Sequence, residues 1–102
     1  MSHPFSVAAA ETLTGTRTLT VAEVSAAHIF HFDPGGAGRN LDLPAAASCT
    51  GLVLFIANKA DGAEVLTIRD AAAATVCTPT QNESAIVWCD GVTWDGGTVT
   101  SS

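Results

Sequence analysis

Histidine and cysteine are the residue types in this chain whose spacing first suggests metal chemistry. His28 and His31 are separated by two residues, a spacing that also occurs in zinc sites. On a strand, residues three apart point to opposite faces, so this pair is not expected to bind one ion. The three cysteines are unclustered and supply no Cys-x-x-Cys pair: Cys49, Cys77 and Cys89. We therefore predict no metal site and no bound cofactor.

The same cysteines are expected to be reduced and buried as small apolar residues. Their odd number leaves a disulfide pair plus one free thiol as the alternative. Reduced thiols suit a chain that folds in the cytosol. The first residues carry neither the basic segment nor the long apolar run of a secretory leader, and no apolar run is long enough to span a membrane.

Other familiar catalytic arrangements are weakly supported. The stretch Gly35–Gly38 is rich in glycine, as phosphate-binding loops are, but it lacks the Gly-Lys-Ser/Thr ending and no helix is expected after it. Carboxylates occur singly in loops, where aspartate commonly supports a turn. No feature fixes the geometry of a Ser/His/Asp or Cys/His triad. The sequence predicts a protein that is not an enzyme and has no small-molecule substrate.

Tryptophan offers a different kind of site, because an exposed indole can stack on a sugar ring. Trp88 and Trp94 are the two tryptophans of the chain. Both have apolar neighbours in expected strands, where burial in the core is the usual outcome. Core positions are therefore the favoured interpretation, and sugar binding is the alternative.

Charge and side-chain size limit the partners. The formal net charge is −6, from 4 Lys and Arg against 10 Asp and Glu, so we expect neither nucleic acid nor an anionic membrane as a partner. Hydrophobic residues make up 47% of the chain, but it has only 4 Phe, 2 Trp, 1 Met and no Tyr. The core of a solitary subunit would be thin, and apolar surface shared with a neighbouring subunit would relieve the shortage.

A first hairpin is predicted at the centre of the chain. It joins the apolar strand Leu52–Asn58 to residues 66–68 through the turn-forming pair Asp61-Gly62. This pairing places Phe55 opposite Ile68, so that apolar residues share one face. The opposite face of the hairpin carries further apolar residues, namely Leu54, Ile56 and Val65.

A second hairpin is predicted around Asp90-Gly91, with Cys89 opposite Val92 and Val87 opposite Trp94. Alternation also predicts strands within 12–20, with a bend at Gly15, and within 28–32, 40–43 and 75–78. Residues 21–27 remain open between a helical turn and an extended segment, and a helical turn is an option within 45–50.

The sum is an all-β chain: one compact β-sandwich or small barrel, jelly-roll-like in style. We expect an extended N-terminal arm over residues 1–11 and a domain over 12–102 that ends in a loose C-terminal tail. No internal repeat of solenoid length is evident.

Several turns and strands, taken in order, resemble those of small structural proteins of tailed bacteriophages. The resemblance covers roughly Phe32 to Trp94, and the stretches that carry it are Asp33–Ala37, Arg39–Pro44, Gly51–Asn58, Ala60–Glu64, Leu66–Ile68, Gln81–Ser84 and Cys89–Trp94. Within that group the chain is most similar to head decoration (cement) proteins, and tail-fibre modules share the style.

The resemblance implies a structural role on the outside of a virion. Decoration proteins sit on the expanded capsid, often as homotrimers, and hold neighbouring major capsid protein subunits together. It implies that Pro4, Phe5 and Val7 of the arm lie on the major capsid protein, where weak contacts of three arms act together. The face with Leu54, Ile56 and Val65 is then the candidate subunit interface. The alternative is a trimeric tail-fibre or receptor-binding module.

Overall fold

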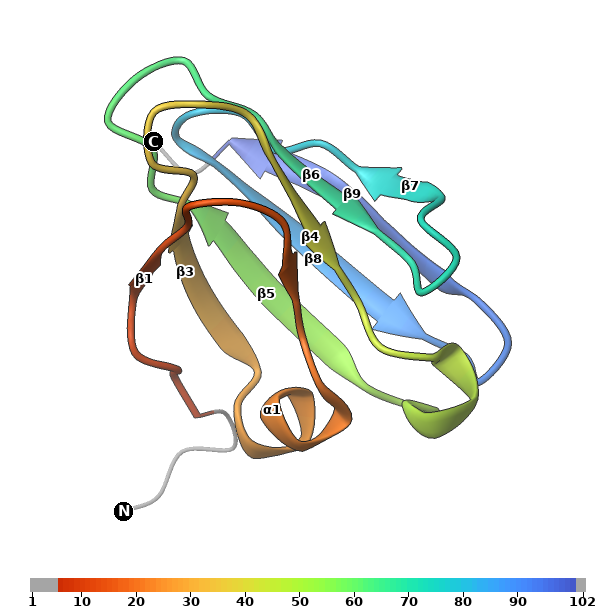
Figure 1. The fold of residues 1–102 in the computed structure, drawn as a ribbon. Coiled ribbons are helices and arrows are strands. Elements are labelled where there is room, and N and C mark those ends of the chain that lie inside the picture. The colour runs from red at the N-terminus through yellow and green to blue at the C-terminus, as the bar shows by residue number, and fades with distance from the viewer. Residues whose placement is uncertain (1–5, 101–102) are drawn as a thin grey trace.

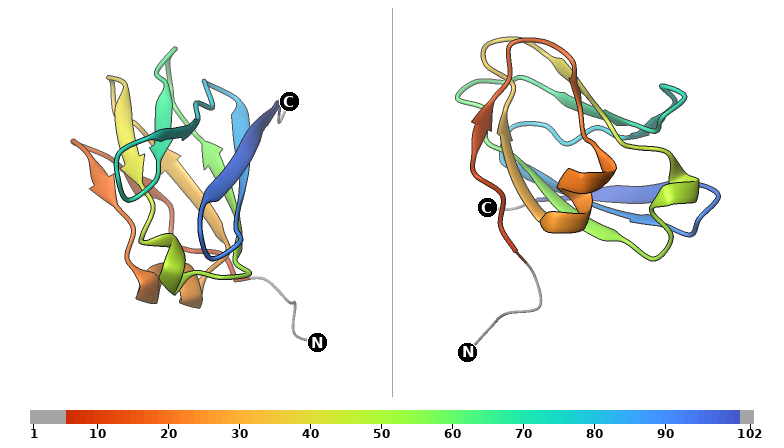
Figure 2. Two further views of the ribbon diagram at one scale, coloured as in Figure 1. Left: turned by 90° about the vertical axis from the view of Figure 1, so that its right-hand side faces the viewer. Right: turned by 60° about the horizontal axis from the view of Figure 1, so that its bottom comes forward.

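The computed structural model describes residues 6–100, and Met1–Phe5 and Ser101–Ser102 lie outside the described residues. Two β-sheets pack face to face as an open sandwich (Figures 1 and 2). The five-stranded sheet has the order β1 (Glu11–Thr12), β3 (Ile29–Asp33), β5 (Val53–Asn58), β8 (Glu83–Cys89) and β9 (Trp94–Thr100). The four-stranded sheet has the order β2 (Arg17–Thr18), β4 (Arg39–Asp42), β6 (Leu66–Arg69) and β7 (Thr75–Cys77).

The first six strands alternate between the two sheets. The chain crosses from the five-stranded to the four-stranded sheet after β1, β3 and β5, and returns after β2 and β4. Each of these strands pairs in parallel with the strand two places later in the chain. As a result, β1, β3 and β5 are neighbours in one sheet, and β2, β4 and β6 are neighbours in the other. Parallel neighbours need a crossover between them, and here that crossover is the passage through the opposite sheet.

The last three strands are antiparallel to their neighbours. β7 pairs with β6 across an irregular step, β8 returns beside β5, and β9 forms a hairpin with β8. The architecture is therefore a sandwich of two mixed sheets, and it is neither a closed barrel nor the antiparallel double sheet of a jelly roll. The all-β prediction is confirmed and the jelly-roll style is wrong.

The first predicted hairpin is wrong. β5 lies between β3 and β8, whereas β6 lies in the other sheet between β4 and β7, so Phe55 and Ile68 are not paired. The segment with Asp61-Gly62 is a loop that crosses between the sheets. Buried Asn58 orders this loop, because its Nδ2 donates to the carbonyl oxygens of Glu64 and Pro79 at 2.9 and 3.0 Å.

The second hairpin forms, but its predicted register, with Cys89 opposite Val92 and Val87 opposite Trp94, is wrong. Cys89 pairs with Trp94 and Val87 with Gly96, so the loop has four residues and not two. The Asp90 side chain accepts from the backbone N–H groups of Val92 and Thr93, both at 2.8 Å, which stabilises the four-residue form. Because the pairing shifts by an even number of residues, the side chains keep the faces that alternation predicted.

The two returns contain short helical turns. The open segment 21–27 contains α1 (Val21–Ala26), which begins with a capping box between Thr20 and Glu23. The second return contains a 3-10 turn, η1 (Ala46–Ser48), at the place where a helical turn was an option.

The core lies between the sheets and is built mainly from aliphatic side chains. Alternation puts every second strand residue inward, and the inward residues with no more than 4% exposure include Phe30, Phe32, Leu41, Leu54, Ile56, Leu66, Ile68, Ala85 and Val87. The core is continuous from β3 to β9, so the inward apolar side chains of the two sheets are buried against each other without a second subunit.

Both ends of the described chain belong to the sheet. His28 and Ile29 donate their backbone N–H to the Ser6 carbonyl, Val7 bridges Ile29, and β1 continues beside β3. At the other end, β9 stays paired as far as Thr100 with Glu83. The arm predicted over 1–11 and the loose tail are therefore wrong for residues 6–11 and 95–100.

Candidate functional site

The outer face of the five-stranded sheet has two largely apolar cross-strand rows beside a more polar row of His31, Ala57, Ser84 and Val99. One cross-strand row runs from Ile29 through Phe55 and Ile86 to Gly97. The next row toward the β8–β9 loop contains Val53, Trp88 and Asp95. The most exposed of its large apolar side chains are Val53 at 36%, Trp88 at 46% and Val99 at 47%. We call this surface, on β3, β5, β8 and β9, the apolar face.

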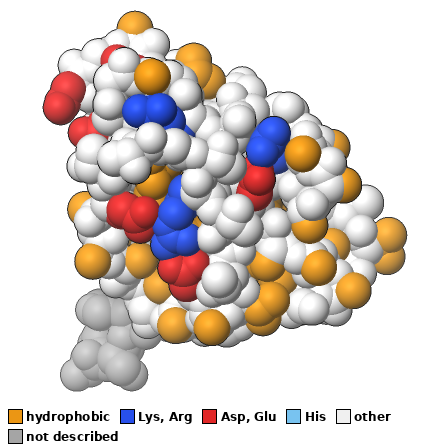
Figure 3. All heavy atoms as spheres, viewed as in Figure 1, with side chains coloured by type: hydrophobic (Ala, Val, Ile, Leu, Met, Phe, Trp, Pro, Cys, Tyr) orange, Lys and Arg blue, Asp and Glu red, His pale blue; other side chains and the backbone are white. Residues whose placement is uncertain are grey.

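The outer face of the four-stranded sheet is polar and is internally paired. Thr18, Asp42 and Arg69 form one row across β2, β4 and β6. Arg69 donates to both carboxylate oxygens of Asp42, at 2.7 and 2.9 Å. The hydrogen bonds and the charge of Asp42 raise the pKa of Arg69. Figure 3 views the molecule from this side, and charged side chains of both signs are gathered on it. We call it the charged face.

An ionic cluster lies where β1 and β2 meet at one side of the sandwich. Arg17 of β2 donates to Glu11 of β1 at 2.8 Å and to both carboxylate oxygens of Glu23 in α1. The hydrogen bonds from Arg17 and from the Thr20 backbone lower the pKa of Glu23 to about 2. The same carboxylates raise the pKa of Arg17. A hollow of about 370 Å³ lies beside the cluster, above Phe30 and Phe32. The cluster links the two sheets. The charges of Arg17, Glu11 and Glu23 are all paired within it.

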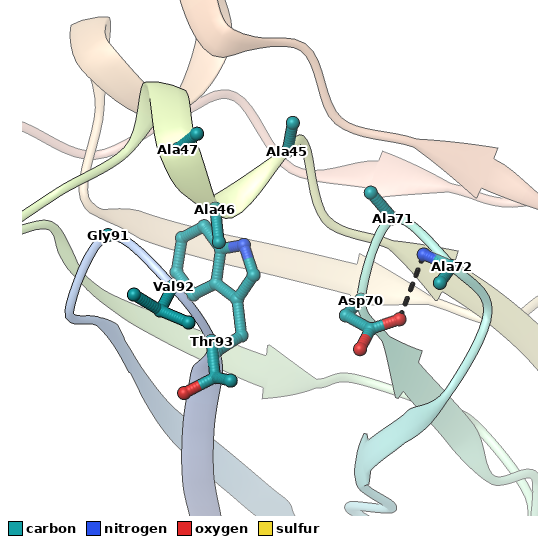
Figure 4. Close-up of a pocket in the computed structure, with 10 residues that line it drawn as sticks. Ala45, Ala46, Ala47, Asp70, Ala71, Ala72, Gly91, Val92 and Thr93 are labelled. Atoms are coloured by element: carbon teal, nitrogen blue, oxygen red, sulfur yellow. Dashed lines mark hydrogen bonds between the residues drawn. The ribbon is translucent and has the colours of Figure 1, made fainter.

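A second hollow, of about 350 Å³, lies at the end of the sandwich near η1 (Figure 4). Its walls are mainly alanines of η1 and of the β6–β7 turn, together with Val92 and Trp94. Trp94 is 5% exposed and donates its indole N–H to the Pro44 carbonyl at 2.8 Å. The carboxylate of Asp70 accepts from the backbone N–H groups of Ala72 and Ala74, which holds the β6–β7 turn. Asp70, the acid at this hollow, is thus engaged in a turn.

The residues predicted for partner binding do not form one site. Pro4 and Phe5 lie outside the described residues. Val7 is 60% exposed and lies at the edge of the apolar face, beside Ile29. Leu54 and Ile56 have no exposed surface, because both point between the sheets.

The predicted subunit interface is therefore wrong for Leu54 and Ile56. Val65 is half-buried in the crossing loop, and its carbonyl accepts from the backbone N–H of Arg39. The error follows from the hairpin assignment, which placed Leu54 and Ile56 on the outer side of a sheet that does not exist. The residues of β5 that face outward are Val53, Phe55 and Ala57.

The tryptophan prediction is confirmed for Trp94 and wrong for Trp88. Apolar neighbours suggested burial for both, but Val87 and Cys89 point inward and alternation sends Trp88 outward. The signal that finds Trp88 is its parity within β8, and that parity was visible in the sequence.

The three cysteines are free and buried, as predicted. Burial raises the pKa of the Cys77 thiol to about 11 and raises that of Cys49, which disfavours the reactive thiolate form of both. Within residues 6–100, no group of three or more His, Cys, Asp or Glu side chains is arranged to hold a metal ion.

Comparison with models of protein families, with curated proteins and with solved structures finds no match to this chain. In the described part of the chain, no helix combines the length and the apolar character needed to cross a membrane.

Proposed function

We propose that this protein decorates the outside of a tailed-phage capsid and stabilises it by bridging neighbouring major capsid protein subunits. The observation that carries the proposal is the apolar face, where Trp88 and Val53 are exposed side by side on neighbouring strands. Exposed apolar surface of this kind marks a site of protein association. The resemblance of the turns and strands to head decoration proteins supplies the phage context.

The two faces suggest how such a protein is oriented. Because they lie on opposite sides of the sandwich, docking through the apolar face would direct the charged face to solvent. The net charge of −6 would then keep coated particles soluble and apart. Each contact can be weak, because many copies act on one shell. A homotrimer remains a prediction, to be measured by light scattering.

The direct test adds the purified protein to capsids that were assembled without it. We expect binding in many copies and a higher temperature of capsid disruption. Trp88→Ser should abolish both effects while the variant stays folded, because Trp88 is on the surface. The matched control is Val92→Ser, which removes an apolar side chain that is 81% exposed in the β8–β9 loop, outside the face. Absence of binding by the unmodified protein would contradict the proposal.

Trp88 also favours a second candidate, a tail-fibre or receptor-binding module. The Asp95 carboxylate lies on the neighbouring strand directly opposite this exposed indole. An aromatic ring beside a carboxylate is a combination that sugar sites use. This candidate predicts a few copies per particle, in the tail, and binding to host-cell glycans that Trp88→Ser and Asp95→Asn both remove.

A further inference from the structure

Strand β9 is an open edge of the five-stranded sheet. It is the last strand in the order and, among the described residues, forms a ladder only with β8; β7 of the other sheet lies close to β9 without pairing with it. Its seven residues contain no proline, no lysine and a single charge, Asp95, and the pairing with β8 is regular. Proteins usually blunt such edges with charge, proline or a bulge. Residues 97–100 are also exposed. This strand therefore has the properties of a pairing site.

β9 contains two adjacent glycines, and the fold requires glycine at only one of the two positions. A Cβ at Gly96 would lie 2.5 Å from the Ile86 carbonyl oxygen and 2.7 Å from a Val87 methyl group, so glycine is required there. A Cβ at Gly97 would meet nothing within 4 Å, and its φ is not in the left-handed region. Glycine in a strand is unfavourable without a local reason. Within residues 6–100, no close contact and no positive φ requires glycine at position 97.

A neighbouring strand would give Gly97 a function. Gly97 ends the apolar row that contains Ile86 and Phe55, so the edge strand has no side chain at this position to pack against the half-buried Ile86 of β8. An aromatic residue on an adjacent strand characteristically folds over a glycine at a sheet edge and restores the missing packing. The position is thus shaped to receive an aromatic side chain from a strand added beside β9.

The charges around β9 indicate which molecule brings that strand. Asp95 and Glu83 lie near the two ends of the β8–β9 pair. The arginines of this chain are largely engaged: Arg17 with Glu11 and Glu23, Arg69 with Asp42, and Arg39 with the Pro34 carbonyl. A second copy with a net charge of −6 would bring acidic groups toward acidic groups. A different protein with lysine or arginine is the complementary partner.

We propose that β9 receives, by strand addition, an extended segment of a different protein that has an aromatic residue opposite Gly97 and basic residues at its ends. Main-chain hydrogen bonds to β9 would supply affinity, and the ring over Gly97 would supply register. The identification of this protein as a capsid subunit rests on the proposed function; the strand addition itself does not.

The test uses Gly97→Val, which fills the open space with a strand-favouring side chain. We expect an intact fold and a loss of affinity for empty capsids of about tenfold or more, whereas the control Val92→Ser binds as the unmodified protein does. In parallel, a synthetic strand peptide of about nine residues, with a central Phe and terminal lysines, is titrated against the isotope-labelled protein and followed by NMR. Shifts should be confined to the amides of β9 and its neighbours in β8, and a peptide with terminal glutamates should bind more weakly.

The two arms separate the failure of each proposal. Capsid binding that Gly97→Val leaves unchanged, with no peptide shifts at β9, would overturn the strand addition and leave decoration intact. Peptide binding at β9 without capsid binding would support the strand addition and reject decoration. If the unmodified protein self-associates and Gly97→Val makes it monomeric, the occupant is a second copy and the assignment to a different protein is wrong.

Discussion

The two outer faces of the sandwich follow the same strand alternation and reach opposite results. On the charged face, Asp42 and Arg69 neutralise each other across neighbouring strands, so that surface is complete in water. On the apolar face, Val53 and Trp88 are also cross-strand partners, yet both remain substantially exposed. Covering an exposed cross-strand apolar pair removes apolar surface from water, whereas covering an ion pair carries a desolvation cost.

This difference draws attention to where the few large side chains of the chain are placed. The core between the sheets is filled by aliphatic residues of both, and one of the two tryptophans is placed outside it. In a chain with few bulky residues, the exposed Trp88 is the side chain to which the proposed function assigns an interaction. Substitutions on the inner and outer sides of the five-stranded sheet should therefore differ in their effect on stability, and substitutions on the two outer faces should differ in their effect on capsid binding.

The largest effect is expected from a comparison of neighbours on β5 that point to opposite sides. Leu54→Ala removes a side chain with no exposed surface and should lower the free energy of unfolding by about 2–5 kcal/mol. Val53→Ala, one residue earlier and 36% exposed, should cost about 1 kcal/mol or less. Urea unfolding of the two variants measures the difference. Similar costs would mean that the strand is turned over and that the apolar face is misassigned.

Alanine should lower stability at Gly96 of β9 but not at Gly97. Gly96→Ala forces a clash with the β8 backbone and should cost about 1–3 kcal/mol. Gly97→Ala enters open space and should be neutral or stabilise by about 0.4–1 kcal/mol, because it restricts the unfolded chain. Thermal unfolding measures both. A loss of stability in Gly97→Ala would show that Gly97 serves the fold, and the argument for a partner strand would fail.

The sequence was sufficient to locate most strands because alternation is a local property. Phe30 and Phe32 share the buried side of β3, and Leu41 and Leu43 point inward from β4 and its end, as their spacing predicted. The bend expected at Gly15 is where the chain passes from β1 to β2. Local patterns were therefore enough to assign the side of a strand that is buried.

Strand partners were harder to predict because they depend on distant segments. An Asp-Gly pair suits a tight hairpin turn and also suits the crossing loop that contains Asp61 and Gly62, so the dipeptide did not distinguish the two. The parallel stacking of β1, β3 and β5 left no repeat in the sequence, since the returns differ: one contains α1 and another contains η1. The misplaced interface at Leu54 and Ile56 followed from this missing information.

Acid should weaken the side of the sandwich where the two sheets are linked. Glu23 has a pKa lowered from 4.5 to about 2 by Arg17, so its contribution to stability is complete above about pH 5 and is lost as the pH falls toward 2. Unfolding free energies measured across this range should decline less steeply in Glu23→Gln than in the unmodified protein. The control is Asp61→Asn, an exposed carboxylate in the crossing loop. Parallel curves for Glu23→Gln and the unmodified protein would contradict the assignment.

The smallest effect is expected on the charged face itself. Asp42→Asn leaves a hydrogen-bond acceptor for Arg69 but removes the charge, and the net contribution of this partly exposed ion pair to stability should be small. We expect a slight decrease in thermal stability that disappears at high salt, because screening already weakens the pair there. Capsid binding should be unchanged, since Asp42 lies on the side opposite to Trp88. If Asp42→Asn reduces binding and Trp88→Ser does not, the charged face is the docking surface, and the comparison on which the proposed function depends is reversed.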